Sequence, residues 1–530
     1  MDCALSLLNP FAHLERNVIT NMMRSIKNAL TGILFCAMIS LAQNTTPTAK
    51  AGSPMIKAAD LQADLVVLRK AYEELHPGLY RYNTKAEMDD HFDELKRKFS
   101  HDLSLQDAYL AFSEFAAQVK CGHTYPNFFN QTKEIAAELF QGQNRVPYYF
   151  EWLNDRMVVT RDFTPDHKLP RGTQVLAING NSSSLILKRL MTIARADGSN
   201  DAKRVAYLEV TGDDKYEAFD IYFPMFFPQS STTIQLLAQR PGERKPVKIA
   251  VQALTYAERI EPRKSQEETL QGGDQPLFEW KYLDDGSAYL RMPSWALYNS
   301  KWDWKTWLNA KLDELADKNT PALIVDLRGN EGGNDVGDEI LSRLVTQDLK
   351  IPTFGRLVRY RQTPEDLNPY LDTWDSSFKD WGAAARDLEK PWPTAPPVHY
   401  FLLVREGESP DGDVIVHSAR PFHGKLFVLI DANNSSATFQ FDQIVKENKL
   451  GTLVGQPTGG NLRGINGGAF FFLRLPKSHI EMDIPLIARF PSTPQPDAGI
   501  TPDISVAKKI DDIITGADPE MAAVRAQLRK

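Results

Sequence analysis

An apolar strand that ends in a glycine-rich turn, at residues 321–333, limits most strongly what this chain can fold into. The run Ala-Leu-Ile-Val is typical of a buried strand, and it continues into a polar turn that ends with Gly332 and Gly333. Glycines lack Cβ, so a substrate carbonyl can approach backbone amides there, and oriented amides stabilise an oxyanion. A phosphate-binding loop is excluded because neither the Gly-Lys-Ser/Thr nor the GxGxxG pattern is present. A strand-to-helix turn with purely structural glycines is the alternative.

A second strand-to-helix junction offers a nucleophile. The apolar residues 426–430 are followed by a polar turn and by a helix-like stretch at 439–448. Ser435 and Ser436 stand at this junction, where a helix N-terminus would stabilise nearby negative charge, so either is a candidate nucleophile. Both residues could instead be helix N-caps.

Four motifs together resemble the tail-specific (C-terminal processing) serine peptidases, a group that includes the tricorn core protease and the interphotoreceptor retinoid-binding protein modules. They occur in the family's order at residues 324–333, 436–437, 453–460 and 499–503. The Cys-Gly-His-Thr segment at 121–124 and a PDZ-type signature at 170–180 extend the resemblance upstream. The resemblance implies an α/β fold with a layered catalytic core related to the crotonase/Clp-type ββα fold, an N-terminal helical domain and a PDZ-like domain.

The family contains two catalytic designs, and this chain fits the one that uses histidine. In Ser-Lys members a lysine follows the Gly-x-Pro-Thr-x-Gly turn, but here Asn461 occupies that place, with Arg463 beyond it. Neither side chain can act as a base at ordinary pH. In tricorn-like members a histidine before the PDZ-like segment takes the serine proton, and His123 stands in that position. The resemblance therefore implies that His123 is the general base.

The resemblance also implies a nucleophile and an oxyanion hole. The family pattern is a serine followed by a small residue, and Ser436 with Ala437 fits it better than Ser435 does. We expect Ser436 to be the nucleophile. The N–H of Ala437 would be one oxyanion donor, and the N–H of Gly332 or Gly333 would be the second.

The acidic partner of His123 is predicted to be Asp497, the acidic residue immediately before the Gly-x-x-Pro-Asp segment. A proline, Pro496, stands about where the family glutamate is expected. Glu481 and Asp483 are the alternatives, because strand alternation would place both on the same face. That face could instead simply be solvated.

Charge and cysteine content exclude several function classes. The net charge is −7 with both signs interspersed, and no dense basic cluster indicates a nucleic-acid surface. No HExxH or CxxC pattern occurs, so we expect neither a metal nor another cofactor. Cys3 and Cys36 lie in or before an expected leader, and Cys121 is expected to be a small buried hydrophobic residue.

Residues 1–42 are predicted to be a leader and signal peptide. Arg24 and Lys27 precede the apolar stretch 29–42, whose last three residues, Ser-Leu-Ala, supply small side chains for cleavage before Gln43. The stretch is too short for a transmembrane helix. We therefore expect a periplasmic or secreted protein that has no membrane span after cleavage.

Three domains are expected after the leader. Helical periodicity at 57–144 predicts an N-terminal helical domain, and shorter strand-like runs at 145–262 predict the PDZ-like domain. Residues 276–515 alternate strands with helices, which favours a layered α/β catalytic core with an insertion at about 355–420. PDZ-type modules bind peptides as an added strand and capture their C-terminus, so such a domain could select protein tails.

The function expected from these features is that of an exported serine endopeptidase. It would cleave peptides or protein tails by acyl transfer through a Ser-His-acid site, with a peptide or unfolded protein as its partner. A noncatalytic protein on the same fold that binds a ligand or peptide is one alternative, and a small ester hydrolase is another. A serine and a histidine at both matching positions favour the enzyme.

Overall fold

The computed structural model describes residues 55–261, 272–351, 354–407 and 412–529. The predicted leader and signal peptide at 1–42 lies outside these residues. Within the described ranges, every helix is too short or too polar to cross a membrane. Helices and sheets are both present, which confirms the predicted α/β class.

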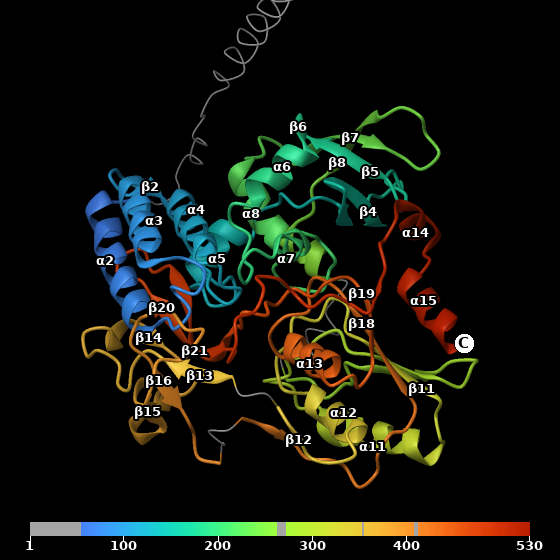
Figure 1. Cartoon of the computed structure of the whole chain (residues 1–530). Helices are drawn as coiled ribbons and strands as arrows, with labels where there is room; N and C mark the ends of the chain where they lie inside the picture. Colours follow the sequence, from blue (N-terminus) through green and yellow to red (C-terminus); the bar gives the residue numbers. More distant parts are fainter. Residues whose placement is uncertain (1–54, 262–271, 352–353, 408–411, 530) are drawn as a thin grey trace, which may run out of the picture. The chain divides into compact units, whose positions relative to one another are not determined.

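A six-stranded sheet carries the motifs that the sequence singled out (Figure 1). Its order is β22-β19-β18-β11-β10-β9, and all neighbours are parallel except β9 and β10. The strands are β9 (Glu279–Tyr282), β10 (Ala288–Arg291), β11 (Ala322–Asp326), β18 (Lys425–Ile430), β19 (Thr452–Gly455) and β22 (Ile504–Ser505). Since parallel strands end at the same edge, the turns after β11 and β18 lie side by side.

Helices cover both faces of this sheet, which explains why β11 is apolar throughout. Leu323 and Val325 pack with one group of helices, whereas Ala322 and Ile324 pack with α15 on the other face. The first group is α11 (Trp304–Asp317), α12 (Gly337–Leu344) and α13 (Ser436–Glu447); α14 (Ile510–Thr515) precedes α15 (Pro519–Leu528). A strand buried on both faces needs apolar residues at every position.

A second, antiparallel six-stranded sheet has the order β14-β20-β21-β13-β16-β15. Its strands are β13 (Gly355–Val358), β14 (Leu371–Asp372), β15 (Ala385–Asp387), β16 (Phe401–Leu403), β20 (Asn466–Arg474) and β21 (Glu481–Phe490). Short 3-10 turns lie at Asn368–Tyr370, Ser376–Lys379 and Gly382–Ala384. The predicted insertion therefore supplies four of the six strands.

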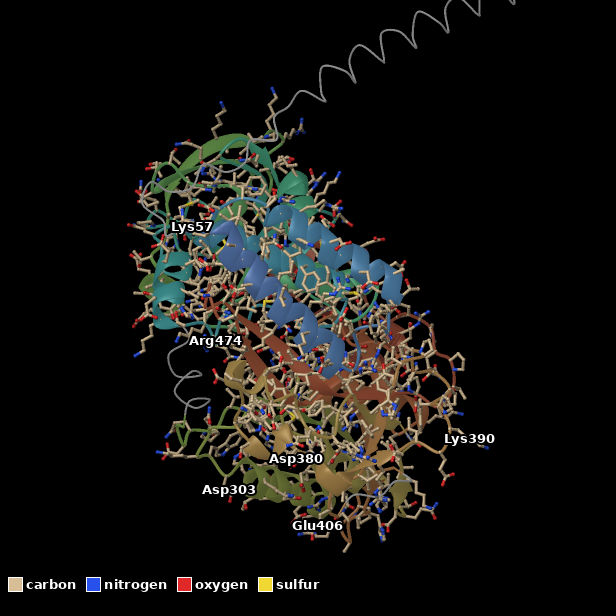
Figure 2. The ribbon with its side chains drawn as sticks, turned by 90° about the vertical axis from the view of Figure 1, so that its left-hand side faces the viewer. Lys57, Asp303, Asp380, Lys390, Glu406 and Arg474 are labelled. Carbon is tan, nitrogen blue, oxygen red and sulfur yellow. The ribbon has the colours of Figure 1, made fainter. Side chains whose placement is uncertain are left out.

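The N-terminal helices share one hydrophobic core with this second sheet. They are α2 (Ala58–Leu75), α3 (Lys85–Lys98), α4 (Leu105–Gln118) and α5 (Lys133–Phe140). Figure 2, in which Lys57 marks the start of α2 and Arg474 the end of β20, shows α2 lying against the strands of the sheet. Two short antiparallel strand pairs lie outside the large sheets: β1 (Met55–Ile56) with β2 (Leu103–Ser104), and β12 (Leu349–Lys350) with β17 (Val414–Ile415).

A third sheet, antiparallel throughout, occupies the region predicted to be PDZ-like. Its order is β3-β4-β5-β7-β8, and β6 pairs with β5. The strands are β3 (Tyr148–Leu153), β4 (Arg156–Asp162), β5 (Gln174–Ile178), β6 (Asn181–Ser182), β7 (Thr233–Gln239) and β8 (Val247–Gln252). The helices are α6 (Ser183–Leu190), α7 (Asp201–Tyr207), α8 (Ala218–Phe226) and α9 (Tyr256–Ile260).

Candidate active site

Ser436 is the first residue of α13 and has an unusual backbone conformation. Its φ is +53°, in the left-handed region that residues other than glycine rarely adopt. The preceding turn is held by Asn434, whose side chain accepts from the Asp431 N–H at 2.8 Å and donates to the Leu327 carbonyl at 2.6 Å. Strained residues of this kind persist where the surrounding structure enforces them, and they are frequent at active sites. The conformation of Ser436 therefore suits a nucleophile at a strand-to-helix junction.

Ser435 has a different environment. It is the N-cap of α13, but its side chain makes no capping hydrogen bond. Its hydroxyl instead donates to the carbonyl of Glu331 at 3.3 Å. This bond connects the turn at residues 431–436, the nucleophile turn, to the turn at residues 327–333, the glycine turn.

The two glycines of the predicted oxyanion turn play different roles. Gly332 lies against the nucleophile turn: a Cβ on it would be 2.8 Å from the Ala437 nitrogen and 2.9 Å from the Ser436 Cβ. Its N–H already donates to the side chain of Asn330 at 2.9 Å. Gly333 pairs with Trp295 in a parallel bridge that uses the Gly332 carbonyl and the Asn334 N–H, so the N–H of Gly333 points away from Trp295.

His123 follows α4 and lies beside β20, with its ring centre 5.6 Å from that of Phe470. Its Nδ1 is buried and has no hydrogen-bond partner among the described residues. Burial lowers the pKa of His123 below the ordinary histidine value; of the charges around it, Asp197 acts most strongly and opposes this shift. A neutral imidazole is the form that a general base requires.

Glu331 lies where the histidine and the two turns converge. Its carboxylate bonds to the Lys203 ammonium and, at 3.2 Å, to Arg195. Burial acts to raise the pKa of Glu331, but Lys203 and Arg195 hold it at about 2, and the charge of Glu331 also acts on His123. Gly332, the next residue, contacts Ser436. In the described structure no hydrogen bond joins His123 to Ser436, a bond that peptidase sites often tighten only when substrate binds.

Asp497 is held away from a direct bond to the histidine. Its carboxylate accepts from the Ser199 N–H at 3.0 Å, the Ser199 hydroxyl at 2.9 Å and the Asn461 side chain at 2.7 Å. Burial acts to raise the pKa of Asp497, but these hydrogen bonds outweigh it and lower the pKa overall. The same Asn461 amide donates to the carbonyl of Asp197 at 3.1 Å, so Asp497 reaches the histidine region only through other residues.

The two alternative acids, Glu481 and Asp483, lie on β21 and are both buried, so the solvated face considered from the sequence is wrong. Asp483 accepts from the side chains of Asn127 at 2.7 Å and Asn130 at 3.2 Å. Burial raises the pKa of Asp483 to about 6 and that of Glu481 well above its ordinary value. The pair anchors the loop that follows His123, because the Asp483 N–H also donates to the carbonyl of Tyr125 at 3.1 Å.

An aromatic surface adjoins His123. It consists of Phe470, Phe472 and Trp374, and the Trp374 ring centre lies 5.8 Å from each phenylalanine. Trp374 is 60% exposed, which is unusual for so large an apolar side chain. The surface is therefore available to an apolar group that approaches the histidine.

Sequence reasoning missed Arg195, Asp197, Lys203 and the role of Glu331. These residues gather at the site from a loop and helix in the region of the third sheet and from the glycine turn. A charged residue inside an otherwise glycine-rich turn, Glu331, was the one available signal. The described residues include no group of three or more His, Cys, Asp or Glu side chains placed to hold a metal ion.

Comparisons with known proteins show similarity in the sequence of one region and in the overall fold. Residues 286–506 match the model of peptidase family S41. Mature CPAF complexed with lactacystin has a similar fold, with 15% identity and a TM-score of 0.59 over 89% of this chain and 98% of that one. A second structure of mature CPAF gives 15% identity and a TM-score of 0.56 over 88% and 96%. No curated protein sequence matches the chain significantly.

Proposed function

Since the chain carries a serine peptidase domain of family S41 at residues 286–506, we propose that it cleaves peptide bonds by acyl transfer through Ser436. The match confirms the resemblance to the tail-specific peptidases that the motifs indicated. The observation that carries the proposal is the left-handed backbone of Ser436 at the start of α13, in contact with Gly332.

The first chemical step is attack of the Ser436 hydroxyl oxygen on the substrate carbonyl. His123 takes the hydroxyl proton and later gives it to the leaving amine, and a water then hydrolyses the acyl-enzyme by the same route. Burial keeps His123 neutral before the reaction, and the carboxylates of Asp197 and Glu331 favour the imidazolium that forms during it.

The oxyanion of the tetrahedral intermediate would accept hydrogen bonds from backbone amides. Ala437 supplies one donor from the first turn of α13, where N–H groups have no partner within the helix. Gly333 is the better second donor, because the N–H of Gly332 is bonded to Asn330. Asn330 then fixes the turn that presents Gly333.

The substrate proposed is a peptide or an unfolded protein with an apolar residue near the scissile bond. The aromatic surface beside His123 would contact that residue. Two further parts of this proposal rest on sequence patterns. The PDZ-like region would select protein tails, and the segment at 1–42 would direct export to the periplasm or the cell exterior.

Covalent labelling tests the proposed chemistry. The protein is treated with a fluorophosphonate probe, and the modified peptide is identified by mass spectrometry. Lactacystin, which is bound in one CPAF structure, is tested as a competitor. We expect the label on Ser436, its loss in Ser436→Ala, and its retention in the matched control Ser435→Ala. An unlabelled, inactive wild-type protein would favour the noncatalytic alternative.

A further inference from the structure

Residues 195–203, the bridging segment, connect the separate parts of the candidate active site. The Gly198 N–H donates to the carbonyl of Lys120 at 2.9 Å, just before residues 121–124, the histidine loop. The side chain of Asn200 donates to the carbonyls of Thr458 at 2.9 Å and Gly460 at 3.1 Å. The bridging segment therefore contacts both the histidine loop and the glycine-rich turn after β19.

Two cations of the bridging segment reach further into the site. Lys203 bonds to the carboxylate of Glu331 and donates to the carbonyl of Asn433, in the nucleophile turn, at 3.2 Å. Arg195 bonds to Glu331 and to the carbonyl of Gly122. The position of this segment thus determines how the histidine loop, the glycine turn and the nucleophile turn meet.

Asp197 is a buried carboxylate in the bridging segment, with 2% of its surface exposed. One of its oxygens accepts from the Gly122 N–H at 3.0 Å, directly before His123. A Cβ on Gly122 would lie 3.0 Å from the other oxygen, so the carboxylate packs against the backbone of the histidine loop. Desolvation of a carboxylate is unfavourable, so a buried carboxylate normally has hydrogen bonds or opposite charges that compensate for it.

His123 lacks the partner that a catalytic histidine normally has. Its Nδ1 is buried and unbonded within the described structure, whereas buried polar atoms are usually hydrogen-bonded. The charged groups that act on it are Asp197, Arg195, Glu331 and Lys203. Arg195 and Lys203 both bond to Glu331, which offsets its charge, whereas Asp197 bonds to the histidine loop itself.

We propose that Asp197, rather than Asp497, is the carboxylate that positions His123 and stabilises its imidazolium form during the reaction. Asp497 contributes only indirectly: it accepts hydrogen bonds from Ser199 in the bridging segment and from Asn461. Asp197 acts on His123 through the backbone and through its charge, so it is a positioning residue. This inference rests on the proposed function, in which His123 is the base.

The closing experiment compares Asp197→Asn with Asp497→Asn. Asparagine retains an oxygen that can accept the Gly122 N–H, so the first variant mainly removes the charge. Because that charge raises the pKa of His123, its loss lowers the pKa and moves the acid limb of the kcat/KM profile to lower pH. We expect kcat to fall by about a hundredfold with KM nearly unchanged, because the neutral side chain no longer stabilises the charge that forms on His123 in the transition state.

The Asp497→Asn variant is the matched control. It should lower kcat by less than about tenfold and leave the acid limb in place, since Asp497 does not bond to the histidine loop. The proposal would be overturned if the acid limb of the kcat/KM profile moved in Asp497→Asn but stayed in place in Asp197→Asn. Failure of the proposed function looks different: wild-type protein would then be inactive and unlabelled at Ser436.

A second substitution keeps the test decisive if Asp197→Asn does not fold. Asp197→Glu retains the charge but displaces the carboxylate by one methylene. We expect a reduced kcat with an acid limb close to that of the wild type, measured on protein whose Tm shows that it is folded. An unchanged kcat in folded Asp197→Glu would contradict the positioning role.

Discussion

Gly332 lies directly against Ser436: a Cβ placed on the glycine would lie 2.9 Å from the Cβ of the serine. Real Cβ atoms do not approach so closely, so only glycine fits beside the nucleophile turn. This contact joins two motifs that lie at the ends of adjacent parallel strands, β11 and β18.

Replacement of Ser436 by glycine should separate activity from stability. Ser436→Gly and Ser436→Ala both remove the hydroxyl and should abolish peptidase activity. Glycine accepts a φ of +53° without strain, so Ser436→Gly should have a free energy of unfolding about 1 kcal/mol above that of Ser436→Ala. Denaturant unfolding measures the difference, and equal stabilities would show that the backbone at 436 is not strained.

Replacement of Gly333 by alanine should lower kcat per folded molecule, in addition to any loss of stability. The glycine has a φ of +138°, and a Cβ added to it would lie 2.2 Å from backbone atoms of Trp295, so the turn must shift and carry the amide with it. We expect Gly333→Ala to lower kcat per folded molecule by about a hundredfold, the usual effect of a lost oxyanion donor. A lower Tm with unchanged kcat per folded molecule would make the glycine structural.

Peptidase activity should decline on the acid side of neutrality. Protonation of His123 removes the base, and burial lowers its pKa, so the acid limb should lie below about pH 6.5, the unperturbed histidine value. Initial rates on a small peptide between about pH 4 and 9 measure the limb. His123→Ala should remove most of the rate along with it, whereas a rise centred well above about pH 8 would indicate a lysine base.

The buried pair Glu481 and Asp483 should make the protein less stable as pH rises. Burial raises the pKa of both groups, so their stabilising effect is complete at low pH. The contribution of Asp483 is lost as pH rises to about 6, its pKa in the folded protein, and that of Glu481 is lost as pH rises through its own raised pKa. The decrease in Tm between about pH 5 and about pH 8 should be smaller in Glu481→Gln than in the wild type. The exposed control Glu389→Gln should follow the wild-type curve.

Removal of Trp374 should affect binding rather than chemistry. Trp374→Ala deletes the exposed part of the aromatic surface and should raise KM for peptides with an apolar residue at the cleavage site by about tenfold. The kcat should change little, since Phe470 still contacts His123. An equal increase in KM for peptides that carry only small polar residues would show that Trp374 does not select apolar residues.

Local sequence determined the strands, the turns and the identity of the chemical groups. An apolar run followed by paired glycines predicts β11 and its turn, because the apolar pattern of a strand and the backbone freedom of glycine are properties of the local sequence. The same holds for the helix after the second strand, which was expected at 439–448 and is found as α13 (Ser436–Glu447), and for Asn461, which occupies the place of the lysine in the Ser-Lys design. The α/β class and the similarity of residues 286–506 to peptidase family S41 were therefore predictable before the structure was known.

Only the tertiary structure decided which charges surround the histidine. Gly122 and Asp197 are 75 residues apart in the sequence, and Lys203 lies 128 residues from Glu331. Sequence proximity to the last motif favoured Asp497, but the fold directs its carboxylate to Ser199 and Asn461. Likewise, strand alternation could not tell that helices and a loop bury the face carrying Glu481. Burial and electrostatic partners depend on long-range packing, which no local pattern encodes.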